Sequence, residues 1–232
     1  MRPTRSTTIW RGPGWRETCW VSLVLFHSVS SLAKRTLDVA LSGGGLVASA
    51  PLWPLIAAAI KMDSGGPVFY AQRRVGAGGL PFTVLKFRSM IADAERASGP
   101  VQAHAADPRI TRVGRLLRAT AMDELPQLLN IFRGDMSFVG PRALRPEEID
   151  SDSGGAPVPL SAIPGFMQRC AVPPGLTGIA QIYAPRDISR RQKFRFDLLY
   201  VRRRSFVLDV RLILLSFWIT FRGTWEKREK KF

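Results

Sequence analysis

Apolar side chains gather in two long stretches of the chain, one toward each end. Leu37 to Ile60 holds 24 residues with Asp38 as its single charge. At about 1.5 Å per residue, a helix of this length can cross a hydrocarbon core of about 30 Å. Pro51 and Pro54 interrupt the stretch, and a proline removes a backbone donor and clashes with the preceding helical turn. The pattern therefore predicts a membrane helix with a sharp bend past its middle.

The charges beside this stretch favour a re-entrant hairpin. Lys34 and Arg35 precede it and Lys61 follows it. Because basic residues near membrane segments prefer the cytoplasmic side, both ends favour the same side. We expect the helix to break at residues 49–51 and return, so that residues 34–62 form a re-entrant membrane hairpin. A kinked helix that spans the whole membrane is the structural alternative.

The second apolar stretch is too short to span a bilayer. Phe206 to Phe221 has 16 residues and contains Asp209 and Arg211, which predicts a helix lying in the membrane interface. The sequence from Asp187 to Arg204 predicts a basic helix before it. Residues 186–232 carry 14 Lys and Arg against 5 Asp and Glu, and basic residues around an apolar stretch are typical of a membrane surface.

The middle of the chain predicts smaller elements. Val68 to Val75 and Phe82 to Phe87 are joined through a glycine-rich turn and predict a β-hairpin. Alternation places Lys86 and Arg88 on one face, where both can point at one anion, although a solvated basic face explains them equally well. Further elements are predicted as a short basic helix over Thr111 to Ala119, a helix from Pro126 to Phe132, and loops over residues 151–178.

These elements together predict an α+β fold that is mostly helical. Residues 1–33 form an N-terminal extension, residues 34–62 the re-entrant hairpin, and residues 63–232 a small cytoplasmic catalytic domain with a β-hairpin and interfacial amphipathic helices. A chain of 232 residues has room for one such domain. Since only a short extension precedes the hairpin, we do not expect several leading transmembrane helices.

Charge and cysteine content narrow the function classes. The net charge of +16 and the pI near 11.2 call for an anionic partner, which is nucleic acid, an anionic bilayer or a phosphorylated substrate. Cys19 and Cys170 lie far apart, and His27 and His104 are near neither. We therefore expect no zinc site and no disulfide framework, only ordinary packing or surface residues.

The acidic pair Asp123-Glu124 is the strongest candidate for chemistry. Acidic residues before a helix usually serve as simple caps. Here, however, arginines surround the pair in the sequence, at positions 109, 112, 115, 118, 133 and 142. Such cations suit a polyanion such as a diphosphate. Because carboxylates repel phosphates, a site that holds both usually contains a divalent metal, and Mg²⁺ with oxygen ligands from Asp123 and Glu124 is the natural choice. The pattern indicates phosphoryl transfer.

Several motifs in fixed order resemble one known family from about residue 34 to residue 222. They are Lys34-Arg35-x-x-Asp38, Gly66-Pro67-Val68-Phe69, Lys86-Phe87-Arg88-Ser89-Met90, Asp123-Glu124-Leu125-Pro126-Gln127, Gly134-Asp135-Met136-Ser137-Phe138-Val139-Gly140-Pro141-Arg142 and Pro174-Gly175-Leu176-Thr177-Gly178. The chain resembles the bacterial sugar transferases, also called monotopic phosphoglycosyl transferases or polyprenyl-phosphate hexose-1-phosphate transferases.

The resemblance implies an enzyme of the bacterial inner membrane, with its catalytic domain on the cytoplasmic face. It would transfer a sugar 1-phosphate from a UDP-sugar to polyprenyl (undecaprenyl) phosphate, the priming step of exopolysaccharide or another surface glycan. By resemblance Asp123 forms a phosphosugar-aspartyl intermediate and Glu124 assists as metal ligand or base. Lys86 and Arg88 would clamp phosphate, while Pro141 and Arg142 would serve the nucleotide end of the site.

Three positions depart from the family pattern without removing a catalytic group. Ala50-Pro51 stands where the family usually has Ser-Pro, Ala143 replaces the second proline of Gly-Pro-Arg-Pro, and Ala121-Met122 replaces Ser-Leu before the acidic pair. The donor sugar is left open among glucose, galactose and N-acetylated sugars, and so is a homo-oligomeric state. The competing interpretations are a membrane-bound nucleic-acid-binding protein and a non-catalytic scaffold. Neither explains the Asp-Glu site, so we expect no nucleic-acid partner.

Overall fold

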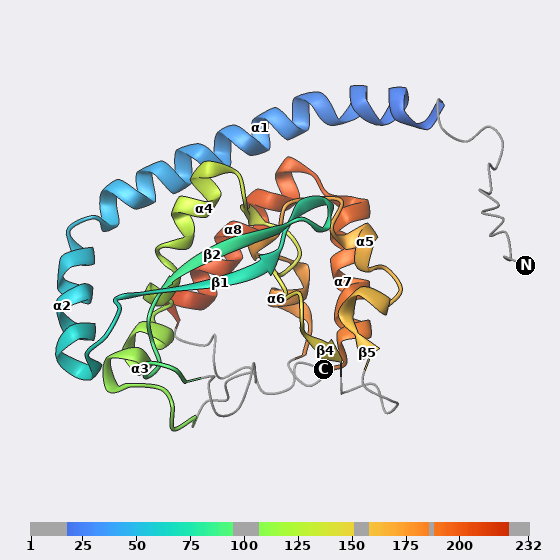
Figure 1. Ribbon diagram of the computed structural model, residues 1–232. Coiled ribbons are helices and arrows are strands. Elements are labelled where there is room, and N and C mark those ends of the chain that lie inside the picture. Colours follow the sequence, from blue (N-terminus) through green and yellow to red (C-terminus); the bar gives the residue numbers. More distant parts are fainter. Residues whose placement is uncertain (1–17, 95–106, 151–157, 186–187, 223–232) are drawn as a thin grey trace, which may run out of the picture.

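The computed structural model describes residues 18–94, 107–150, 158–185 and 188–222 (Figure 1). Its architecture is α+β and mostly helical, which confirms this part of the prediction. The helices are α1 (Thr18–Ser49), α2 (Leu52–Ser64), α3 (Arg112–Ala119), α4 (Gln127–Arg133), α5 (Phe166–Arg169), α6 (Ile179–Tyr183), α7 (Arg190–Arg203) and α8 (Phe206–Phe221). The strands are β1 (Phe69–Val75), β2 (Pro81–Phe87), β3 (Ser137–Val139), β4 (Ile149–Asp150), β5 (Val158–Pro159) and β6 (Gly175–Thr177).

The break in the first apolar stretch lies where the prolines predict it. Helix α1 ends at Ser49 and α2 begins at Leu52, and the two are bent by 62°. Trp53 Nε1 donates a hydrogen bond to Ser49 Oγ across the break, at 3.1 Å. Within the described residues, no single helix has the length and apolarity to cross a membrane, but this bent pair meets both conditions together, as a broken span or a re-entrant loop would. Helix α1 also runs without interruption through the predicted boundary at residue 33.

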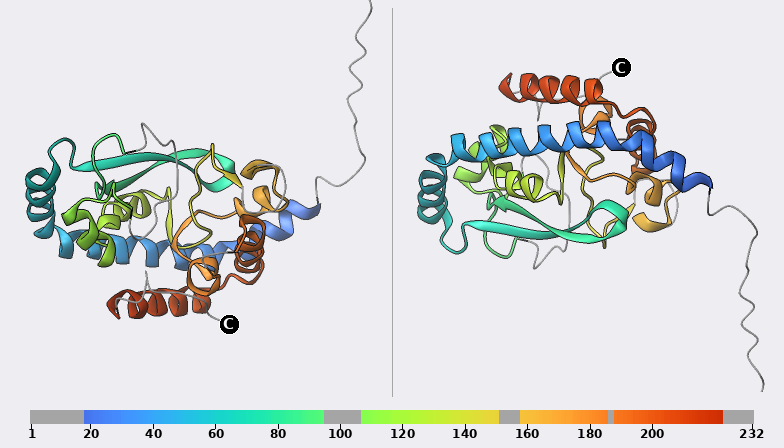
Figure 2. Two further views of the ribbon diagram at one scale, coloured as in Figure 1. Left: turned by 90° about the horizontal axis from the view of Figure 1, so that it is seen from below. Right: turned by 90° about the horizontal axis from the view of Figure 1, so that it is seen from above.

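Helix α1 extends along one side of the domain, with α4 and α8 against it (Figures 1 and 2). Arg35 caps the carboxyl end of α4, donating from Nη1 to the carbonyl of Ile131 and from Nη2 to that of Phe132, both at 2.7 Å. Asp38 is buried and accepts hydrogen bonds from Ser137 Oγ and Phe138 N at the start of β3. Polar side chains of the first motif therefore attach the long helix to α4 and β3.

The predicted β-hairpin is confirmed. Strands β1 and β2 pair antiparallel from Phe69 opposite Phe87 to Val75 opposite Pro81. The expectation of loops over residues 151–178 is wrong for part of the described range, because β6 pairs in parallel with β3 and α5 lies before it. Such short segments owe their structure to distant partners, which local sequence does not reveal.

The main core lies between these layers. It joins Val84 of β2, residues of α4, strand β3 and the helices α6, α7 and α8; its members include Leu128, Ile131, Phe138, Val139, Ile182, Tyr200 and Leu212. A second cluster beneath the bent helix pair comprises Ile56, Ile60, Phe87 and Leu117. The acidic pair stands beside both, since partly buried Leu125 packs against each cluster.

Candidate active site

The acidic pair lies directly before α4, as the sequence predicts. Met122–Glu124 forms a single 3-10 turn, and Pro126 follows as the N-cap of α4. Ala121 turns the chain sharply just ahead of the pair, with φ of 56° in the left-handed region that alanine rarely adopts. Strain of this kind is often found at functional sites, where the surrounding structure maintains it.

Asp123 is a buried carboxylate with two cations and a second carboxylate close to it. Asp123 is only 9% exposed, and this burial raises the pKa of its carboxyl group to about 6 from the ordinary 3.8. The Lys86 and Arg118 cations lower this pKa, while the neighbouring Glu124 carboxylate raises it further. Asp123 is therefore largely ionised at neutral pH but lies close to its titration range.

Glu124 is held ionised by two cations. Burial acts to raise its pKa, but the Lys86 ammonium and the Arg142 guanidinium outweigh that effect and keep the pKa below its ordinary value. Lys86 Nζ lies 2.5 Å from Glu124 Oε1. The two carboxylates consequently differ in basicity, although they are adjacent in the chain.

The position of Lys86 is fixed by α4. Asn130, 1% exposed, donates from Nδ2 to the carbonyl of Thr83 at 2.8 Å and accepts from the backbone N–H of Leu85 at 3.1 Å. These bonds hold β2 on the helix that follows the acidic pair. The register that brings Lys86 opposite Glu124 is thus set by a buried amide side chain.

Arg88, predicted to share an anion with Lys86, makes different contacts. Its Nη2 atom donates to Ser64 Oγ at 2.9 Å and to the carbonyls of Ser64 and Gly65 at the end of α2. Its Nε and Nη1 atoms are buried and have no hydrogen-bond partner among the described residues. The structure therefore gives Arg88 a contact with α2 and leaves two of its nitrogen atoms without a partner, so its anion-binding role stays a prediction.

The predicted nucleotide-end residues are held by the strand beside them. Pro141 is buried, and its carbonyl accepts from the backbone N–H of Gly175 at 2.9 Å. The Arg142 side chain is exposed, and its charge helps to lower the pKa of Glu124. Arg142 is thereby brought to the same site as Asp123, Glu124 and Lys86.

Two further residues belong to this site. Arg118, in the last turn of α3, lowers the pKa of Asp123, although the sequence identified it only as one of several nearby arginines. Gln127 is 4% exposed, and hydrogen bonding by its side chain helps to lower the pKa of Glu124. Its place in the Asp-Glu-Leu-Pro-Gln motif is the signal that could have found it.

The donor set is compatible with Mg²⁺. No group of three or more His, Cys, Asp or Glu side chains that could hold a metal occurs among the described residues. Mg²⁺ typically takes one or two protein carboxylates and completes its shell with water and phosphate oxygens. Asp123 and Glu124 fit that pattern. They do not fit a structural zinc site, which needs four protein ligands.

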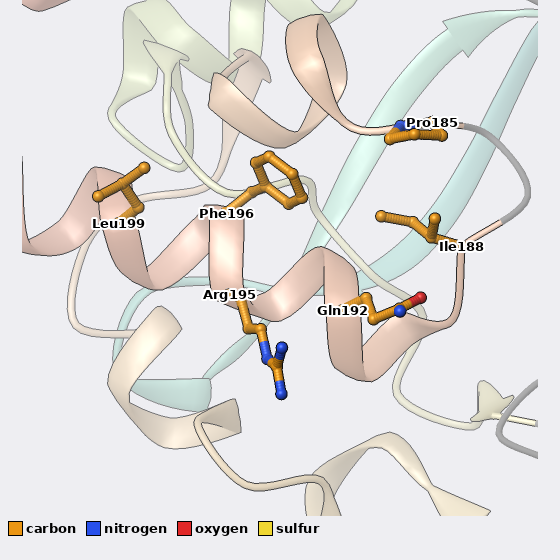
Figure 3. A pocket seen from close by; sticks show the side chains of 6 residues that line it. All are labelled: Pro185, Ile188, Gln192, Arg195, Phe196 and Leu199. Atoms are coloured by element: carbon orange, nitrogen blue, oxygen red, sulfur yellow. The ribbon is translucent and has the colours of Figure 1, made fainter. Parts of the chain in front are cut away.

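A separate cavity of about 410 Å³ lies along α7 (Figure 3). Its walls are mainly apolar and consist of Pro185, Ile188, Gln192, Arg195, Phe196 and Leu199. None of these is a predicted site residue. The chemistry-bearing groups are therefore not in this cavity.

Comparison with known proteins identifies the family. A family model described as bacterial sugar transferase matches residues 29–223, which include every predicted site residue. The chain belongs to the bacterial sugar transferase family. In this bacterial sugar transferase the matched range also covers both parts of the bent helix pair described above.

Three relatives of this sugar transferase share 42% identity with it. The undecaprenyl-phosphate glucose phosphotransferase of Komagataeibacter xylinus aligns over 80% of the chain and 35% of its own length. The UDP-glucose:undecaprenyl-phosphate glucose-1-phosphate transferase of Caulobacter vibrioides aligns over 79% and 67%. The exopolysaccharide production protein PSS of Rhizobium leguminosarum bv. phaseoli aligns over 78% and 90%. The chain thus spans about a third of the first relative and most of the third.

Proposed function

We propose that this chain transfers glucose 1-phosphate from UDP-glucose to undecaprenyl phosphate, as the priming step of exopolysaccharide synthesis. The observation that carries the proposal is the buried Asp123 carboxylate, ionised near neutral pH beside Lys86 and Arg118, while Arg142 acts on the adjacent Glu124. Relatives whose names specify UDP-glucose and undecaprenyl phosphate support the choice of donor and acceptor.

The reaction proceeds in two displacements. A carboxylate oxygen of Asp123 attacks the phosphorus that carries glucose, and the bond from that phosphorus to the bridging diphosphate oxygen breaks, so that UMP leaves with the electron pair. A phosphate oxygen of undecaprenyl phosphate then attacks the same phosphorus, and Asp123 leaves as a carboxylate. Covalent catalysis divides one difficult transfer between two anions into two easier steps.

The surrounding residues offset the negative charge of the two phosphates. Lys86, Arg118 and Arg142 provide cations, and the unpaired Nε and Nη1 groups of Arg88 donate hydrogen bonds to phosphate oxygens. Asp123 and Glu124 would hold Mg²⁺, which when bound neutralises charge on the diphosphate. Lys86 additionally keeps Asp123 deprotonated, which a nucleophile requires.

The proposed location is the cytoplasmic face of the bacterial inner membrane. Helices α1 and α2 form the re-entrant hairpin of this proposal, and their exposed side chains around the break are apolar, namely Val47, Leu52 and Leu55. Helix α8 exposes Val207, Leu214, Phe217, Trp218 and Phe221. Exposed apolar faces on these three helices suit contact with lipid, where the acceptor substrate resides.

The test is UMP release by detergent-purified protein with Mg²⁺, undecaprenyl phosphate and a panel of UDP-glucose, UDP-galactose and UDP-N-acetylglucosamine. We expect UMP release from UDP-glucose, loss of it in Asp123→Asn, and a glucose phosphate adduct on the Asp123 peptide when the acceptor is omitted. Glu147→Gln, at an exposed position, is the control that should behave as wild type. Release that persists in Asp123→Asn would refute the nucleophile, and no release from any donor would refute the activity.

A further inference from the structure

The backbone around Arg142 is bonded at every carbonyl from residue 139 to residue 144. The donors belong to α1, α5, α6, α7, β1 and β6; they are Lys34 and Tyr200 for Val139, Gln181 for Gly140, Gly175 for Pro141, Arg169 for Arg142, Arg74 for Ala143 and Val75 for Leu144. An extended segment usually receives such hydrogen bonds from the strands beside it, whereas here the donors come from six different elements of the domain. The segment is therefore fixed from many directions.

The donor to Arg142 is a buried guanidinium, whereas Arg74, the other arginine among these donors, is only partly buried. Arg169 Nη2 lies 2.5 Å from the Arg142 carbonyl oxygen, and Arg169 Nε lies 2.8 Å from Asp197 Oδ2. The side chains of Arg169 and Asp197 are 3% and 5% exposed. The guanidinium carbon also lies 4.9 Å from the centre of the Phe194 ring. Held on three sides, this group has a single orientation.

The opposite side of the same segment leaves no space for adjustment. A Cβ atom on Gly140 would lie 2.4 Å from the carbonyl oxygen of Pro173, and one on Gly175 would lie 2.0 Å from the nitrogen of Gly140. The two backbones are thus in direct contact. The position of the Arg142 Cα atom is consequently fixed by two hydrogen bonds. Gly175 donates to the Pro141 carbonyl on one side, and Arg169 donates to the Arg142 carbonyl on the other.

The Arg142 side chain itself is exposed, and an arginine side chain has many rotamers. A long surface side chain keeps much rotamer freedom, so the region its charge can reach depends on the backbone that carries it. Its charge acts on Glu124, at the centre of the proposed active site. A shift of the backbone at residue 142 would therefore weaken substrate contacts without touching Asp123.

We propose that Arg169 is a positioning residue for Arg142, and that through it Arg169 sets the affinity for UDP-glucose. The inference rests on the proposed function. Arg169 makes no substrate contact in this proposal; it holds the Arg142 carbonyl while Asp197 and Phe194 hold Arg169. The residue therefore affects binding of the donor more than the chemical step at Asp123.

The experiment is a double-mutant cycle with steady-state kinetics for UDP-glucose at saturating undecaprenyl phosphate. The variants are Arg169→Gln, Arg142→Ala and the two combined. We expect Arg169→Gln to raise KM about 5- to 20-fold, the scale of one lost charge-assisted hydrogen bond, with kcat within about threefold. Because Arg169 acts through Arg142, the double variant should have the KM of Arg142→Ala alone.

Leu160→Ala is the matched structural control. Leu160 lies in the same small core cluster as Phe194 and is 1% exposed, so its truncation loosens this region without removing the bond to Arg142. An equal rise in KM for Leu160→Ala, or additive effects in the double variant, would overturn the inference. Arg169→Lys keeps a cation beside Asp197, but a lysine cannot donate from two nitrogens in a fork as an arginine does. This lysine variant replaces Arg169→Gln if the glutamine variant does not fold.

The two hypotheses fail in different ways. Absence of UMP release from UDP-glucose in the wild type would remove the proposed function. Normal release in the wild type, together with an unchanged KM in both Arg169 variants, would remove only the positioning role.

Discussion

The Nζ atom of Lys86 lies 2.5 Å from Glu124 Oε1, and the same ammonium is the cation that most lowers the pKa of Asp123. One lysine on β2 therefore acts on both carboxylates of the pair that precedes α4. Without it, two adjacent carboxylates in a buried setting would compete for a proton. The lysine thus connects the β-hairpin to the protonation of the proposed nucleophile.

Replacing this lysine should move the pH dependence of activity. In Lys86→Met the pKa of Asp123 should rise above its present value of about 6, because the largest lowering influence is gone. Since only ionised Asp123 can attack phosphorus, the acidic limb of UMP release should shift to higher pH, and the rate at pH 7 should fall about tenfold or more. Arg73→Met, at an exposed arginine on β1, is the control. An acidic limb at the wild-type pH would contradict the role of Lys86.

Asp123→Asn should abolish activity and stabilise the fold. The folded pKa of about 6 lies above the ordinary 3.8, so ionising Asp123 disfavours folding. The penalty is absent below about pH 4, grows as the pH rises through the folded pKa, and is complete above it. We expect the variant to be more stable than wild type by about 1–3 kcal/mol at pH 7.5, with no difference near pH 4. Chemical denaturation in detergent with EDTA measures this, and an equal gain at both pH values would exclude the carboxylate as its source.

The elements that sequence predicted well are those with a local cause. The prolines at 51 and 54 interrupt a long apolar stretch, and the helix does end at Ser49. The glycine-rich turn between two alternating segments gave the β1 and β2 hairpin nearly residue for residue. The pair Asp123-Glu124 precedes α4 as the helix-start pattern predicts.

What sequence did not reveal depends on distant partners. Strand β6 forms because β3 pairs with it, although the paired residues, Ser137 with Gly175 and Val139 with Thr177, lie 38 positions apart in the sequence. Lys86 and Arg88 share a strand face by alternation, yet β2 ends at Phe87, and Arg88 makes its contacts with α2. The bond from Arg169 to Arg142 joins the last residue of α5 to the segment after β3, 27 positions away, and no periodicity marks it.

Two glycines in helices should respond to alanine in opposite ways. A Cβ atom on Gly114 in α3 would lie 1.9 Å from the carbonyl oxygen of Ser89, a backbone atom that cannot move cheaply. Gly114→Ala should therefore cost more than about 2 kcal/mol and displace Arg118 on the same helix. Gly44 in α1 has nothing within 4 Å of such an atom, so Gly44→Ala should stabilise the protein by about 0.5–1 kcal/mol. Thermal unfolding of both variants checks the contrast, and similar melting temperatures would contradict it.

The re-entrant hairpin and the kinked full span make opposite predictions for the two ends of the bent helix pair. Leu32 and Met62 are 69% and 82% exposed, and they lie near the two ends of that pair. In a variant without native cysteines, Leu32→Cys and Met62→Cys can be labelled with a membrane-impermeant maleimide in inside-out and right-side-out vesicles. If the hairpin returns, both positions should react in inside-out vesicles only, because Lys34, Arg35 and Lys61 hold both ends at the cytoplasmic face.

Val47→Cys gives the matched control close to the break. Val47 is 77% exposed on the protein surface, so the protein itself does not cover it, and protection from the reagent must come from lipid. In a re-entrant hairpin this position should be protected in both vesicle types, while Leu32→Cys and Met62→Cys react together. Labelling of the two end positions from opposite faces would instead establish a kinked span. That outcome would place the catalytic domain and the start of α1 on different sides of the membrane.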